Sequence, residues 1–165
     1  MYTPEHFRIE ELVGPEFHQA NKARGAMMFM AFDQLALVTL DRLRKRYGPI
    51  VVNNWQAGGT FKESGLREMG TGTGAALSQH KFGRAFDCKF RNITPAEVWA
   101  ELQAYPNLSC FEFIQRIEAG AGMTWFHFDT GGHDRYDMAI QVVSYRGDRA
   151  GLPVFVGREG IEVVL

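Results

Sequence analysis

Two short segments in which apolar and polar side chains alternate constrain the fold of this chain most strongly. Residues 85–90 read Ala-Phe-Asp-Cys-Lys-Phe, and residues 125–129 read Trp-Phe-His-Phe-Asp. Because successive side chains of a β-strand point to opposite faces, the phenylalanines of each segment would share a buried face. The opposite faces would display Asp87, His127 and Asp129. The pattern predicts two half-buried strands, at Gly83–Phe90 and Thr124–Asp129, whose polar side chains face a cleft.

The other segments predict further helices and strands around these two. Apolar residues at helical spacing predict a long helix from about Ala26 to Tyr47, which would end at Gly48 and Pro49. A capping sequence that begins at Thr94 predicts a second helix, running to about Ala104. The first 25 residues are expected to hold a short helix. Additional strands are expected at Ile50–Asn54, Phe111–Glu118, Ala139–Tyr145, Pro153–Val156 and Ile161–Leu165.

Composition excludes several classes of partner. The chain has 165 residues, enough for one domain with a hydrophobic core, and a formal net charge of −1. That charge gives no electrostatic reason to expect a nucleic-acid partner, and no apolar run is long enough for membrane insertion. The N-terminus lacks the pattern of a signal peptide, so we expect synthesis in the cytoplasm. Cys88 and Cys110 are too few for a disulfide framework, and Cys88 is expected to be a buried free thiol.

Three polar residues have the chemistry of a metal site. His80 and Asp87 lie seven positions apart, and Gly83 between them could supply the turn that brings both to one ion. With His127 they would form a three-ligand zinc site whose fourth position stays open. A metal in such a site would activate water and polarise a scissile carbonyl group.

Residues 78–87, which read Ser-Gln-His-Lys-Phe-Gly-Arg-Ala-Phe-Asp, together with the downstream Trp-x-His-x-Asp, resemble a known enzyme family. It is the D-Ala-D-Ala metallopeptidase family, which includes D-alanyl-D-alanine carboxypeptidases, D,D-dipeptidases and phage L-alanyl-D-glutamate endolysins and shares its zinc fold with the hedgehog signalling domain. The resemblance is closest to the small phage and prophage branch and covers residues 42–129. It implies one α+β zinc peptidase domain over residues 1–165, with an antiparallel sheet and flanking helices around a zinc cleft. Its core would span about 26–130, and residues 131–165 would be a β-rich extension.

The same resemblance implies roles for individual residues. His80, Asp87 and His127 would bind Zn²⁺. Arg67, at the end of Ser-Gly-Leu-Arg, would stabilise the developing oxyanion. Ser78 and Gln79 are expected to contact substrate, although Ser78 could equally be a turn residue. Independently of the resemblance, Trp125 could form a wall of the substrate groove or serve in structural packing.

The catalytic base is the point where the chain departs from the family. Many relatives have a glutamate or aspartate three residues before the last histidine ligand, where this chain has Thr124. Glu118 could act as the base instead. Asp129 could also be the base, or it could orient an imidazole, and the chain could have no competent base. His133 could line the rim of the cleft or lie exposed in a loop.

The expected function is zinc-dependent hydrolysis of peptide bonds in bacterial peptidoglycan. Both a D-Ala-D-Ala carboxypeptidase and an L-Ala-D-Glu or D,D-endopeptidase are compatible with the motifs. The expected protein is a phage or prophage lysin that acts on the cell wall after release or as part of a virion. The alternative is a catalytically inactive, zinc-stabilised module for wall binding or virion structure. The sequence leaves the oligomeric state open.

Overall fold

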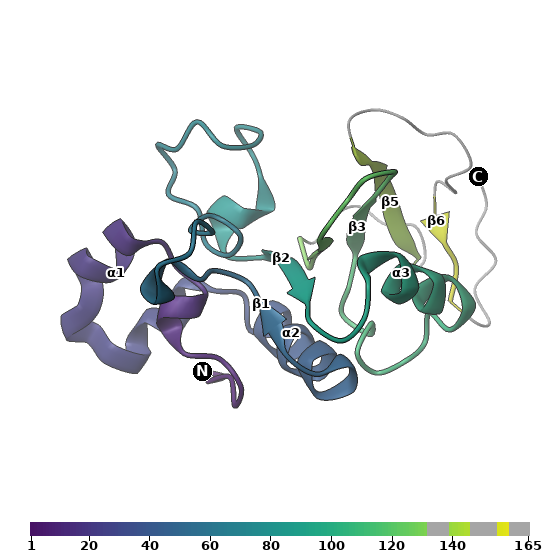
Figure 1. The fold of residues 1–165 in the computed structure, drawn as a ribbon, viewed down its shortest axis with the longest axis horizontal. Helices are drawn as coiled ribbons and strands as arrows, with labels where there is room; N and C mark the ends of the chain where they lie inside the picture. The colour runs from purple at the N-terminus through teal and green to yellow at the C-terminus, as the bar shows by residue number, and fades with distance from the viewer. Residues whose placement is uncertain (132–138, 146–154, 159–165) are drawn as a thin grey trace.

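A computed structural model describes residues 1–131, 139–145 and 155–158 (Figure 1). The α-helices are α1 (Pro15–Asn21), α2 (Gln34–Tyr47) and α3 (Pro95–Ala104). Short 3-10 helices are η1 (Ile9–Glu11), η2 (Lys22–Ala31), η3 (Trp55–Ala57) and η4 (Gln79–Phe82). The strands are β1 (Ile50–Val51), β2 (Ala85–Phe90), β3 (Arg116–Ala119), β4 (Phe126–Asp129), β5 (Ile140–Ser144) and β6 (Phe155–Val156).

The described strands form one sheet in the order β1-β2-β4-β3-β5-β6. All neighbouring pairs are antiparallel except β3 and β5, which are parallel. The expected α+β class with flanking helices is confirmed, but the sheet is mixed rather than antiparallel. The reason is the order of the strands. The chain reverses direction between β4 and β5, which lie on either side of β3, so β5 runs in the direction of β3. Alternating side chains predict strands but do not determine which strands are neighbours.

One face of the sheet is apolar and forms the core with the helices. Phe86, Phe128 and Ile117 from β2, β4 and β3 are fully buried, and α2 and α3 pack against β2 and β4. Phe7 and Leu12 from the N-terminal segment join the same core. Figure 1 shows α1 and η2 at the end of the molecule opposite α3. The described elements thus form a single small α+β domain. Within the described ranges, no helix combines the length and apolar character that crossing a bilayer requires.

The long helix begins later than its apolar spacing predicts. Its first residue is Gln34 rather than Ala26, because the Asp33 side chain caps it by accepting hydrogen bonds from the Leu35 and Ala36 amides at 2.8 and 3.3 Å. The preceding η2 contains a kink at Gly25, whose φ of 52° is not helical. The second predicted helix is confirmed, including the reciprocal cap at its first turn.

Several predicted strands are shorter than expected. β3 begins at Arg116, because the residues before it form turns, with the Phe111 amide bonded to the Leu108 carbonyl oxygen and Ile114 to Phe111. The strand expected at 50–54 has two residues, Ile50 and Val51. β5 and β6 fall within the predicted C-terminal strands, whereas the strand expected at 161–165 lies outside the described residues. Both cysteines are buried and free, as expected for Cys88.

Candidate metal centre

Three side chains from separate elements converge on the polar face of the sheet. His80 comes from η4, Asp87 from β2 and His127 from β4. The Oδ1 atom of Asp87 lies 2.8 Å from Nδ1 of His127 and 3.3 Å from Nε2 of His80. The two imidazole nitrogens are 3.4 Å apart. Each residue thus offers one donor atom to the same small volume, as the sequence predicted.

A glycine turn brings His80 to this position. Gly83 ends η4 in the left-handed conformation with φ 65°, and β2 follows at Ala85. A Cβ atom at Gly83 would lie 2.1 Å from the carbonyl oxygen of Ala31, so the backbone approach there leaves no room for a side chain. The predicted turn between His80 and Asp87 is confirmed, and it depends on glycine for both conformation and space.

Neighbouring groups orient both imidazoles. His80 Nδ1 lies 2.8 Å from the carbonyl oxygen of Gly65, a contact that requires its proton to be on Nδ1. The Nε2 lone pair of His80 therefore faces Asp87 and His127. On His127 the second nitrogen, Nε2, lies 3.7 Å from a carboxylate oxygen of Asp129. This arrangement, in which each outer nitrogen faces an oxygen, is common among metal-binding histidines.

The donor geometry fits a tetrahedral metal ion. Ligand atoms about 2.0–2.1 Å from a tetrahedral zinc lie about 3.3 Å from one another. The two distances from His80 Nε2, 3.3 and 3.4 Å, match this spacing. The 2.8 Å contact between Asp87 and His127 is a hydrogen bond, which an ion would have to replace. Two imidazoles and one carboxylate suit zinc, but they also suit other divalent transition metals.

The three side chains of this cluster shift one another's pKa values. Burial alone would raise the pKa of Asp87, but hydrogen bonds with His127 and His80 outweigh it and hold that pKa well below its usual value. Burial also disfavours the charged form of His127, yet the carboxylates of Asp129 and Asp87 raise its pKa to about 10. The pKa of His80 is lowered, mainly by burial. At pH 7 these directions favour an ionised Asp87, a protonated His127 and a neutral His80.

Arg67 lies beside the cluster, held at two of its three nitrogens. Its Nη2 lies 3.0 Å from Oδ2 of Asp87, and its Nε donates to the carbonyl oxygen of Glu63 at 2.6 Å. Nη1 has no acceptor among the residues that the structure describes. Because Arg67 holds Oδ2 of Asp87, the other oxygen, Oδ1, is directed at the two histidines.

The two candidate bases have different surroundings. Glu118 is the direct partner of His127 across β3 and β4, and its half-buried carboxylate has no hydrogen bond or ion pair to any described residue. Asp129 is fully buried and accepts hydrogen bonds from Arg116 Nε at 2.7 Å and from the Gly131 amide at 3.1 Å. Thr124 is exposed between the turn at residues 121–122 and β4. Glu118 is thus free to exchange protons with a ligand, whereas Asp129 is positioned to orient His127.

The three proposed ligands, Arg67 and Glu118 line one cleft of about 350 Å³, whereas Asp129 and Thr124 do not. Ser78, Gln79 and Trp125, the expected substrate-binding residues, line it as well. The Oε1 atom of Gln79 is buried and has no hydrogen-bond partner in the described part of the chain, so it is available as an acceptor. His133 lies outside the described residues.

Among the charged residues that line the described cleft, sequence analysis missed Arg116. It lies two positions before Glu118 on β3, so strand alternation places both side chains on the polar face. That alternation was the signal that could have identified it.

Comparison with known proteins adds no relative. No family model matches the chain, and neither a curated protein nor a solved structure matches it. The family resemblance of residues 42–129 therefore stays a prediction.

Proposed function

We propose that this protein is a zinc-dependent hydrolase that cleaves a peptide bond in bacterial peptidoglycan. The observation that carries the proposal is the convergence of His80 Nε2, Asp87 Oδ1 and His127 Nδ1 in one cleft. The same cleft holds the Glu118 carboxylate, which has no partner among the described residues. The substrate class and the action on the cell wall, after release or from a virion, rest on the resemblance of residues 78–87 to the peptidase family.

Glu118 is the proposed general base. A bound divalent cation would supply Lewis acidity for a water molecule and for the substrate carbonyl. Because Cβ atoms of directly opposed residues lie about 4.5–5.5 Å apart, the Glu118 carboxylate is within reach of a water molecule beside His127. Glu118 would take a proton from this water on a carboxylate oxygen and pass it to the departing amine nitrogen.

Arg67 is the proposed donor to the carbonyl oxygen as negative charge develops there. Its guanidinium is fixed by Asp87 on one side and by the Glu63 carbonyl on the other. The remaining nitrogen, Nη1, could donate a hydrogen bond without further rearrangement. Such preorganised donors stabilise a transition state more than mobile ones do.

The test is peptide release from purified peptidoglycan by the zinc-loaded protein, followed by mass spectrometry of the products. Glu118→Gln should lower the rate by about 10²–10⁴ while the bound zinc is retained. Asp129→Asn should instead weaken zinc binding by about 10- to 100-fold, because it acts through His127. The product masses would identify the bond and separate a carboxypeptidase from an endopeptidase.

Two outcomes would count against the proposal. Full activity in Glu118→Gln would remove Glu118 from the mechanism. No release from any wall type, despite bound zinc, would overturn hydrolysis itself. Protein that then sediments with the wall would indicate the inactive binding module.

A further inference from the structure

We infer that Arg116 binds a carboxylate of the substrate next to the scissile bond. This inference rests on the proposed function and extends it, because it predicts that the enzyme prefers peptides with a negative charge at that position. Arg116 lies on β3 as the direct partner of Asp129 on β4, and its side chain lines the same cleft as the metal ligands.

Two of the three guanidinium nitrogens of Arg116 have no acceptor among the described residues. Toward the described residues, Arg116 donates from Nε alone, to Asp129 Oδ2 at 2.7 Å. Nη1 and Nη2 donate to no residue in ranges 1–131, 139–145 and 155–158, and 27% of the side chain is exposed. The two terminal nitrogens of a guanidinium form a planar fork that matches the two oxygens of a carboxylate.

Arg67 does not offer the same fork. Asp87 and the Glu63 carbonyl already occupy its Nη2 and Nε, and only 12% of its side chain is exposed. With one free terminal nitrogen, Arg67 suits a single oxygen, such as that of a reacting carbonyl. The two arginines of the cleft therefore differ in the ligand that each can accept.

The pairing with Asp129 fixes Arg116 for this role. Asp129 is fully buried and holds the guanidinium at Nε, while the Arg116 side chain lines the cleft. A guanidinium already held in place loses less side-chain freedom when it binds a ligand. With a divalent metal bound, the metal and the two arginines exceed the carboxylates of Asp87, Glu118 and Asp129 by one positive charge. The loaded cleft would therefore attract an anionic substrate.

Peptidoglycan peptides offer two sources for this carboxylate. One is the free C-terminus that a carboxypeptidase substrate presents. The other is the carboxylate that a D-glutamate residue retains when it is linked through its side chain. The shared chemistry is a carboxylate close to the scissile amide, and the experiment must distinguish the two sources.

The kinetic test uses two matched pairs of peptides with zinc-loaded protein. One pair ends in D-alanine or D-alaninamide, and the other contains D-glutamate or its carboxamide analogue. The pair in which the wild-type kcat/KM differs between the carboxylate and the amide identifies the source of the carboxylate. In that pair kcat/KM should be about 10- to 100-fold higher for the carboxylate, since charge-assisted hydrogen bonds are the strong ones. In Arg116→Lys this ratio should fall toward one, because lysine lacks the fork and its single ammonium faces Asp129.

Controls separate binding from folding. Arg91→Lys changes an exposed arginine just after β2 and should preserve the ratio of the wild type. If Arg116→Lys is unstable, Arg116→Gln combined with Asp129→Asn removes both charges together and leaves no buried charge unpaired. The ratio should also fall in this double variant.

An equilibrium measurement tests the inference without turnover. Calorimetry with zinc-loaded protein should show N-acetyl-D-alanine, or N-acetyl-D-glutamate if that pair is discriminated, binding more tightly than its amide. The difference should shrink in Arg116→Lys. Direct binding of the carboxylate to the metal would leave the difference equal in both proteins and would overturn the inference. Equal hydrolysis of acid and amide by the wild type would overturn it too, with the proposed function intact. Carboxylate binding that depends on Arg116 without any hydrolysis would contradict only the proposed function.

Discussion

His127 Nδ1 lies 2.8 Å from Asp87 Oδ1, and the two residues are direct partners on the antiparallel strands β4 and β2. The pairing of these strands therefore sets the distance between two of the proposed ligands. A shift of the register by one residue would turn one side chain to the apolar face. The third proposed ligand, His80, comes from a separate turn. Strand pairing therefore fixes two of the proposed ligands, whereas the position of His80 depends on its loop.

Zinc binding should release a proton from His127. The pKa of this imidazole is raised to about 10, so the metal-free protein carries the proton at pH 7. A ligand must lose its proton, and the apparent zinc affinity should therefore rise by about tenfold per pH unit up to about pH 10. Calorimetry at pH 7 in buffers of different ionisation enthalpy measures the release, and about one proton per zinc is expected. No proton release would contradict the proposed state of His127.

Gly83→Ala should destabilise the protein and weaken zinc binding. The φ of 65° and the 2.1 Å approach to the Ala31 carbonyl oxygen both disfavour a side chain at this position. Strain of this kind costs about 1–3 kcal/mol, and relief of the contact would displace His80. Urea unfolding and zinc titration measure the two effects. Gly72→Ala is the matched control, because a Cβ atom there meets nothing within 4 Å, and its stability should change little.

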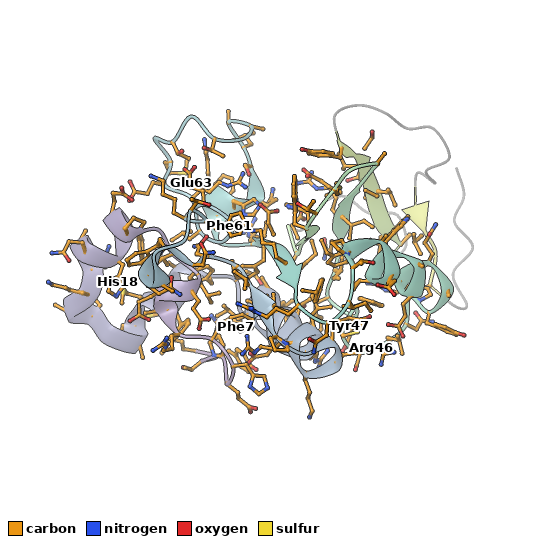
Figure 2. All side chains as sticks on the ribbon, viewed as in Figure 1. Phe7, His18, Arg46, Tyr47, Phe61 and Glu63 are labelled. Atoms are coloured by element: carbon orange, nitrogen blue, oxygen red, sulfur yellow. The ribbon has the colours of Figure 1, made fainter. Side chains whose placement is uncertain are left out.

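Glu63→Gln should loosen the loop that forms one wall of the cleft. The Glu63 carboxylate accepts hydrogen bonds from the hydroxyls of Thr71 and Thr73, and Figure 2 shows Glu63 at the base of this loop. A neutral amide has one acceptor oxygen and no charge, so the two charge-assisted hydrogen bonds should weaken. Amide exchange over residues 68–77 should become about five- to tenfold faster, because a hydrogen bond contributes about 1 kcal/mol. KM should rise more than kcat falls. Glu68→Gln, at an exposed neighbour, should leave exchange unchanged.

The hydrogen bonds from Thr71 and Thr73 to the Glu63 carboxylate should weaken in acid. Hydrogen bonds from Thr71 and Thr73 lower the pKa of Glu63 below its ordinary value of 4.5. A carboxyl group whose pKa is lowered by folding stabilises the folded state above the ordinary value, and this contribution is lost as the pH falls through the lowered pKa. Protection of the amides of residues 68–77, measured against an unfolded peptide at the same pH, should therefore fall as the pH drops below 4.5 in the wild type but not in Glu63→Gln. An identical acid response in both proteins would exclude the carboxylate as its cause.

The sequence predicted well how the site residues that lie on strands, Asp87 and His127, are placed. Alternation in residues 85–90 and 125–129 separated the phenylalanines from Asp87 and His127, and the register confirms that the two polar residues are partners. Alternation is local information, because each side chain's face follows from its position along one strand. The same reasoning applied to β3 would have placed Arg116 beside Glu118.

The parts of the fold and of the site that the sequence did not predict depend on contacts without a recognisable local sequence pattern. The hydrogen bond between His80 and the Gly65 carbonyl joins two irregular segments, and no periodicity predicts it. The parallel pairing of β5 with β3 depends on strand order in space rather than on either strand's sequence. The start of α2 was missed because the side-chain cap of Asp33 outweighs the helical spacing of the apolar residues before it.

The most direct test of the central claim, that His80, Asp87 and His127 bind a metal, is the zinc content of the protein after purification without added metal. Mass spectrometry of the metal should find one zinc per chain in the wild type and none in His80→Ala. His18→Ala, which removes a partly exposed histidine of α1, should retain one zinc per chain. Zinc retained in His80→Ala, or absent from the wild type even after zinc is added, would contradict the account.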